Sequence, residues 1–145
     1  MANETKVFEG TPKALETNGG SIANNAVLLA TTSYDRLTDG LNYPDAEFVL
    51  ALTFSVAPVI NSTVDLYANE QNIKGTNDET TATATYKPRY ITSFVVTSIT
   101  TIQHIKKSVR RVPELATFTL HNNATGQSVS AGWTLDIIPT TLGPV

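Results

Sequence analysis

The chain has 145 residues and a formal charge of −3, with 41% hydrophobic and 16% charged residues. This length and composition predict a single folded domain and argue against a disordered or highly charged chain. The sequence contains no Cys, which excludes a disulfide framework, a thiolate nucleophile and Cys-based metal sites. No stretch approaches the ~20 apolar residues of a membrane span, so we expect no membrane partner.

The charge is unevenly distributed along the chain. Residues 1–86 carry four basic and eleven acidic side chains, whereas residues 87–145 carry six basic and two acidic ones. If the two halves form different surfaces, copies of the chain could associate through them. The alternative, which we favour, is that both halves mix within one fold, so that their opposite charges average out over the surface.

The first 24 residues are polar and rich in turn formers, so they predict an N-terminal arm followed by a first short strand. Val7 and Phe8 are isolated apolar points that could order against a neighbouring chain. Deletion of residues 1–20 is therefore expected to leave a folded domain that no longer docks. The remaining residues, 25–145, are assigned to one β-sandwich domain.

Strand patterns dominate the rest of the chain. The short apolar run 26–32 predicts a buried strand, and residues 34–40 predict a turn or a short helix that ends at Gly40. The clearest strand is 47–56, where the large residues recur with period two and share one face: Phe48, Leu50, Leu52, Phe54 and Val56. Further strands are predicted over 63–69 and 89–99, and residues 102–112 predict an exposed strand or a bend. A long loop is predicted over 69–85, and it ends in a weak edge strand where Thr alternates with Ala.

The last part of the chain predicts a hairpin. The strands 117–120 and 129–138 flank a turn that contains Gly126, and the residues after Pro139 predict an irregular tail. Trp133 falls at an apolar period-two position and is expected to anchor the core. The whole pattern predicts an all-β, antiparallel β-sandwich, with a jelly roll as its candidate form.

No residue pattern predicts catalysis or a cofactor. The two histidines, His104 and His121, have no second ligand type at metal spacing, and no phosphate-binding or nucleophile motif occurs. Four acids lie close enough in sequence to surround a hard cation, but we favour solvated carboxylates with one Asp capping a short helix: Asp35, Asp39, Asp45 and Glu47.

The segment 106–111 is the most concentrated positive charge in the chain. Its cations could contact a polyanion or an acidic protein surface: Lys106, Lys107, Arg110 and Arg111. Nucleic acid is disfavoured, because the sequence pI is about 5.3 and no aromatic residue is interleaved with these cations. The alternative is that the cations protect an edge strand from pairing with other chains.

A Cys-free, Thr- and Asn-rich sandwich with a polar N-terminal arm resembles the small auxiliary proteins of tailed bacteriophage virions, of the capsid decoration or cement type. The similarity lies in residues 116–139 and in the arm before Gly20, and it concerns composition and architecture, with no residue roles carried over. It implies a structural protein made in the host cytoplasm and located on the capsid surface. Its partners would be the major capsid protein and its own copies, as a homotrimer.

Two other functions stay open at this point. A phage tail or fibre component would share the fold class and the self-association but bind a tail partner or a host receptor. A carbohydrate-binding module would use exposed aromatic side chains, and the candidates are Tyr34, Tyr43, Tyr67, Tyr86 and Tyr90.

Overall fold

The computed structural model describes residues 5–71 and 82–144, which form ten strands and one short helix. In chain order these are β1 (Thr5–Glu9), β2 (Lys13–Gly19), β3 (Val27–Leu29), β4 (Tyr34–Asp35), α1 (Arg36–Asp39), β5 (Asp45–Leu52), β6 (Thr63–Glu70), β7 (Arg89–Val95), β8 (Gln103–Val109), β9 (Leu115–Asn123) and β10 (Trp133–Pro144). Within these ranges no helix is long and apolar enough to cross a membrane.

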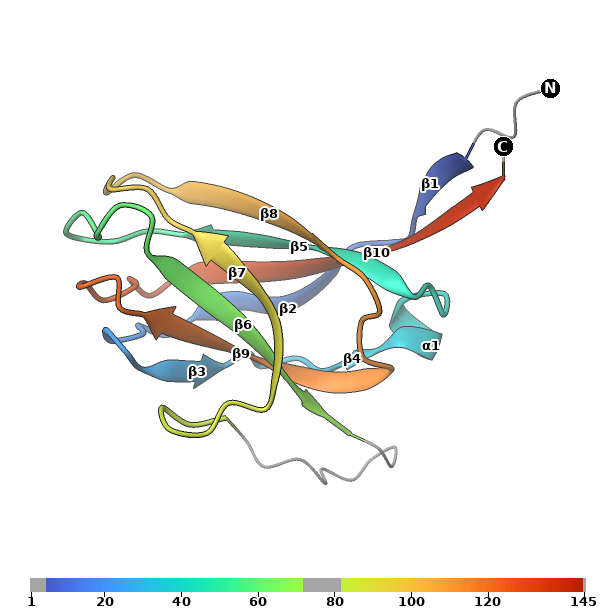
Figure 1. The fold of residues 1–145 in the computed structure, drawn as a ribbon, viewed down its shortest axis with the longest axis horizontal. Helices are drawn as coiled ribbons and strands as arrows, with labels where there is room; N and C mark the ends of the chain where they lie inside the picture. The colour runs from blue at the N-terminus through green and yellow to red at the C-terminus, as the bar shows by residue number, and fades with distance from the viewer. Residues whose placement is uncertain (1–4, 72–81, 145) are drawn as a thin grey trace.

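The strands form two antiparallel sheets that pack face to face (Figure 1). Sheet 1 has the order β1-β10-β5-β8, and β2 also pairs with β10; sheet 2 has the order β3-β9-β6-β7, and β4 also pairs with β9. Counting β1 with β2 and β3 with β4 as interrupted single strands leaves eight, in the orders 1-8-3-6 and 2-7-4-5. That is the strand order of a jelly roll. The prediction of an all-β antiparallel sandwich is confirmed.

The core lies between the sheets and follows the predicted period-two faces. Alternate residues of β5, including Phe48, are fully buried, and the Phe48 ring meets that of Phe118 from sheet 2 edge-on, with centroids 5.3 Å apart. Trp133 is buried as predicted, and its indole Nε1–H donates to the Gly20 carbonyl at 2.7 Å. The strand is shorter than predicted, since β5 ends at Leu52. Beyond it Phe54 is still buried and bridges to Val129, whereas Val56 departs from the prediction and is exposed.

The N-terminal 24 residues divide into two parts. Residues 5–9 form β1, which pairs with the last residues of β10 and extends away from the body (Figure 1). From Lys13 onward the chain belongs to the body, because β2 pairs with the first half of β10 and places Leu15 in the core. The predicted first strand is therefore β2, and Ile22 behind it is also buried.

Three local predictions are wrong. The run 26–32 contains only the three-residue strand β3, which is partly exposed because it lies at an edge of sheet 2. The predicted hairpin does not form, since β9 pairs with β6 and β3 in sheet 2 while β10 pairs with β5 and β1 in sheet 1. The predicted tail after Pro139 is part of β10, whose ladder with β1 continues to Pro144.

The remaining predictions stand, with one exception. The predicted short helix is α1, which ends at Gly40, and β6, β7 and β8 fall within or close to the predicted ranges. Of the loop predicted over 69–85, residues 72–81 lie outside the described ranges. Residues 82–85 form no strand, so the described part of the predicted edge strand is absent.

Candidate docking surface

The ribbon of β1 and residues 140–144 of β10 extends from the body (Figure 1), and we call it the terminal ribbon. Thr5 faces Pro144 at its tip and Glu9 faces Thr140 at its base, where it joins the body. Every residue of β1 is exposed. Beyond Thr140, the other edge of β10 has no partner strand among the described residues, because the pairing of β10 with β5 ends there. Both edges of the terminal ribbon are therefore open in this part of the structure.

Apolar side chains cover both faces of the terminal ribbon. Val7 lies directly opposite Leu142, and the two are 52% and 54% exposed. Because side chains alternate along a strand, Phe8 lies on the other face, where the Lys6 ammonium stands 5.7 Å from its ring centroid. An isolated two-stranded ribbon is marginally stable in water, so such exposed apolar residues favour contact with a further chain.

A cleft of about 230 Å³ lies where the terminal ribbon leaves the body. Its walls come from the terminal ribbon and from the neighbouring ends of β5 and β8. The lining residues are Val7, Asp45, Ala46, Glu47, Ser108, Val109, Arg110, Thr140, Thr141 and Leu142. The cleft thus combines an apolar wall with carboxylates, hydroxyls and a guanidinium. It unites two of the predicted partner-binding residues, Val7 and Arg110, which are about a hundred positions apart in sequence.

The remaining predicted cations do not form one patch. Lys106 and Lys107 alternate across the two faces of β8, and of the four cations only Arg110 lines the cleft. The Lys106 ammonium lies 2.6 Å from a Glu47 carboxylate oxygen, and this hydrogen bond and charge raise the pKa of Lys106. Arg111 is held by its backbone: its N–H donates to Asp45 at 3.0 Å.

These contacts also mix the acidic and basic parts of the chain. Glu47 in the acidic half neutralises Lys106 in the basic half, and Glu70 in β6 pairs in the same way with Arg89 in β7. The favoured alternative, in which acidic and basic charges mix within one fold, therefore holds at both of these ion pairs. The charge halves do not become two separate surfaces, since β5 and β8 are neighbours in sheet 1.

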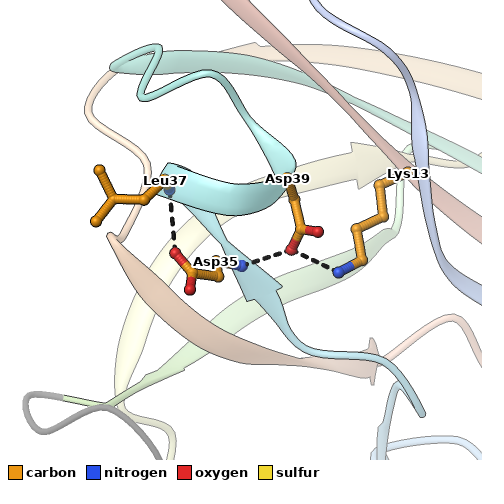
Figure 2. Close-up of polar contacts among 4 residues, drawn as sticks. All are labelled: Lys13, Asp35, Leu37 and Asp39. Atoms are coloured by element: carbon orange, nitrogen blue, oxygen red, sulfur yellow. Dashed lines mark hydrogen bonds and ion pairs between the residues drawn. The ribbon is translucent and has the colours of Figure 1, made fainter.

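The four clustered acids bind protein groups instead of converging on one point. Figure 2 shows Asp35 capping α1, where its carboxylate accepts the Leu37 N–H at 3.0 Å. Asp39 accepts the Asp35 N–H at 2.8 Å and pairs with the Lys13 ammonium at 2.5 Å. The predicted helix cap is confirmed. Within residues 5–71 and 82–144, no group of three or more His, Cys, Asp or Glu side chains is placed to hold a metal ion.

The outer face of sheet 2 carries a second polar and aromatic group. Tyr90 is 54% exposed and meets Tyr67 edge-on at 5.8 Å, while its hydroxyl lies 2.8 Å from that of Ser93. The Ser93 hydroxyl donates to the buried carboxylate of Asp65, which also accepts from Asn123. Asp65 is therefore buried although it lies on the outer face of sheet 2.

The other tyrosines and the histidines are spread over the molecule. Tyr34 is fully buried, which removes it as a binding platform, and burial together with the nearby Asp39 raises its pKa to about 12. His104 is exposed on β8, whereas His121 is buried on β9. Burial and the positive charge of Lys87 lower the pKa of His121.

The cleft residues that the sequence reasoning missed as docking residues include Asp45, Glu47 and Leu142. The period-two pattern of Thr140 and Leu142 could have indicated Leu142, but Pro139 predicts the end of the strand. Pro139 is accommodated because it lies between the residues of β10 that pair with β2 and those that pair with β1, where neither ladder needs its N–H. Its carbonyl still accepts the Gly10 N–H at 2.7 Å. Asp45 and Glu47 were grouped with the other acids because only the pairing of β5 with β8 brings them to the cleft.

Comparisons with known proteins do not assign the chain to a family. No family model, no curated protein and no solved structure matches it. A function is therefore inferred from the geometry of the terminal ribbon and the cleft.

Proposed function

We propose that this chain is a virion structural protein that decorates and stabilises a bacteriophage capsid. It binds major capsid subunits as a homotrimer on the capsid surface. The observation that carries the proposal is the terminal ribbon, which offers Val7 and Leu142 beside a cleft lined by Arg110. A sandwich with a projecting, apolar ribbon is suited to contacts that are weak singly and strong when repeated on a lattice.

The fold is compatible with this role but does not assign it. Jelly rolls occur in viral capsid proteins and equally in lectins, and one fold serves many functions. The proposal therefore stands on the exposed surface. An apolar contact at Val7 and Leu142 would provide affinity, and the charged cleft would fix the orientation of the partner.

The test is co-sedimentation with empty capsids assembled from the major capsid protein of the phage that encodes this chain. We expect the wild-type chain to sediment with the capsids and a Val7→Ser, Leu142→Ser variant to lose most of this binding. Val56→Ser is the matched control, because Val56 is 55% exposed and lies outside the terminal ribbon and the cleft lining. Equal binding by all three chains would contradict the proposal.

A second candidate is glycan binding on the outer face of sheet 2. The observation that favours it is the exposed Tyr90, which stands beside Tyr67 and the hydroxyl of Ser93. An aromatic face next to polar groups is the usual arrangement for a sugar ring. Glycan binding would be favoured over capsid decoration if the chain bound to a glycan array but did not sediment with capsids, and if Tyr90→Ala lost the glycan binding.

A further inference from the structure

The open edge of β1 has a defined set of hydrogen-bonding groups. Gly10 donates its N–H to Pro139, so this pair is hydrogen-bonded. In an antiparallel ladder hydrogen-bonded and non-hydrogen-bonded pairs alternate, which makes the pair of Val7 and Leu142 a non-hydrogen-bonded one. The N–H and C=O groups of Val7 therefore point away from β10, as do those of Thr5 and Glu9.

We propose that a second copy of this chain adds its β1 to this edge, antiparallel and about a two-fold axis at Val7. The pairing joins the two terminal ribbons into one four-stranded sheet, with the order β10-β1-β1-β10. A two-fold contact uses the same patch on both chains, so the edge must be complementary to itself.

The sequence of β1, Thr-Lys-Val-Phe-Glu, meets this requirement. Antiparallel pairing about Val7 sets Thr5 opposite Glu9 and Lys6 opposite Phe8 of the other copy. No like charges face each other. The cation–π contact that Lys6 makes with Phe8 within one chain can be made again between chains. The Val7 side chains of the two copies then lie side by side, each flanked by its own Leu142, on one face of the four-stranded sheet. Pairing therefore joins the two apolar surfaces into one larger surface and leaves that face open to a further partner.

The opposite edge of sheet 1 does not have this property. Pairing β8 with a second β8 about its central residue would set Lys106 opposite Lys106, and like charges directly opposite are destabilising. Lysine on an edge strand is a known protection against such pairing. Of these two edge strands, β1 is therefore the one suited to bind a second copy.

The molar mass in solution tests whether the occupant is a second copy. We expect light scattering after size exclusion to give six chains if the three-fold contact of the proposed homotrimer also forms in solution, or two chains if that contact forms only on the capsid. Val7→Pro removes the N–H at the centre of the edge but no bond to β10, and edge strands accept Pro. It should halve the mass with an unchanged circular dichroism spectrum, whereas Val7→Thr should keep the wild-type mass.

A Val7→Cys variant provides a second, independent test because the chain has no other thiol. In the proposed register the two Cα atoms at position 7 are ~5.5 Å apart, within the range that a disulfide spans. Oxidation should therefore give covalent dimers, and far faster than it does with Val56→Cys, which carries a comparably exposed thiol.

The proposal is overturned by a wild-type mass of one or three chains, or by a Val7→Cys variant that cross-links no faster than Val56→Cys. It does not depend on the capsid proposal, because neither measurement contains capsids. A monomeric chain whose capsid binding is lost on Val7→Pro would show that β1 pairs with the capsid protein. That outcome would overturn the second copy as the occupant and leave the proposed function standing.

Discussion

Glu16 shows how one carboxylate holds two segments of the body together. One of its oxygens accepts the N–H groups of Thr17 and Asn18, each at 3.0 Å, and the other accepts the N–H of Thr31 at 3.1 Å. The side chain is 5% exposed. Burial alone would raise its pKa, but the hydrogen bonds from these backbone groups outweigh burial, and the pKa of Glu16 is lowered below 4.5.

We expect Glu16→Gln to destabilise the domain by ~1–3 kcal/mol at neutral pH, because an amide nitrogen replaces one accepting oxygen. The folded-state pKa is depressed, so the unfolded chain binds a proton first as the pH falls below 4.5. The contribution is thus present above that pH and is lost as the pH falls through the folded-state pKa. Urea denaturation should show that the difference in unfolding free energy between Glu16→Gln and wild type is smaller below the unfolded-state pKa than at neutral pH.

The control for this prediction is Glu114→Gln, because Glu114 is exposed. It should match wild type within ~0.5 kcal/mol, the usual effect of a surface substitution. A Glu16→Gln variant as stable as wild type at neutral pH, or a difference independent of pH, would contradict the role assigned to the carboxylate.

Gly19 is required by the indole of Trp133. A Cβ atom at position 19 would lie 1.9 Å from Trp133 Cε2, whereas one at position 20 would lie 3.4 Å from its nearest neighbour, Leu28 Cδ2. Gly19→Ala should therefore destabilise the domain by at least ~1–3 kcal/mol, the usual cost of overpacking. Gly20→Ala is the adjacent control. Equal thermal midpoints for the two variants would show that Trp133 can move aside.

Among the elements, β1 and β2 lie on the same edge of β10 but have different surroundings. All of β1 is exposed, whereas β2 contributes Leu15 to the core and ends against Trp133. The Leu15 carbonyl also accepts the Thr32 N–H at 3.0 Å, so β2 is bound on its outer edge as well. Only β1 has the character of an arm.

The expected behaviour of truncated chains changes accordingly. Deletion of residues 1–10 should leave a folded sandwich, because it removes only the exposed strand β1. Deletion of residues 1–20 should unfold or loosen it, since losing Leu15 alone costs ~2–5 kcal/mol of a total stability of ~5–15 kcal/mol. The near-ultraviolet circular dichroism of Trp133 distinguishes the two. A native spectrum for the longer deletion would restore the original expectation that residues 1–20 are dispensable.

At the scale of the molecule, the sequence predicted individual strands correctly but did not predict the jelly-roll order in which they pair. The main part of β5, predicted as 47–56 and observed as Asp45–Leu52, and the burial of Trp133 were predicted because period-two burial is a local signal that the sequence carries directly. The hairpin between β9 and β10 was wrong because a turn near Gly126 is equally compatible with a connection between sheets. Local turn chemistry does not state in which sheet the next strand pairs.

The candidate surface was predicted only in part for the same reason. Val7 and Phe8 stood out as apolar residues in a polar segment, and they are exposed. The sequence predicts one positive patch around Lys106, but strand alternation places Lys106 and Lys107 on opposite faces and leaves Arg110 at the cleft. The contribution of Leu142 was hidden by Pro139, which usually ends a strand.

Local sequence patterns were enough to specify the all-β class, the main core strand, the buried Trp133 and the short capped helix, because each depends on side-chain periodicity or on contacts between near neighbours. The assignment of strands to two sheets, the length of the arm and the cleft emerged only once the chain was folded. These features depend on pairings between residues far apart in the chain, such as β1 with β10, whose registers no local pattern specifies.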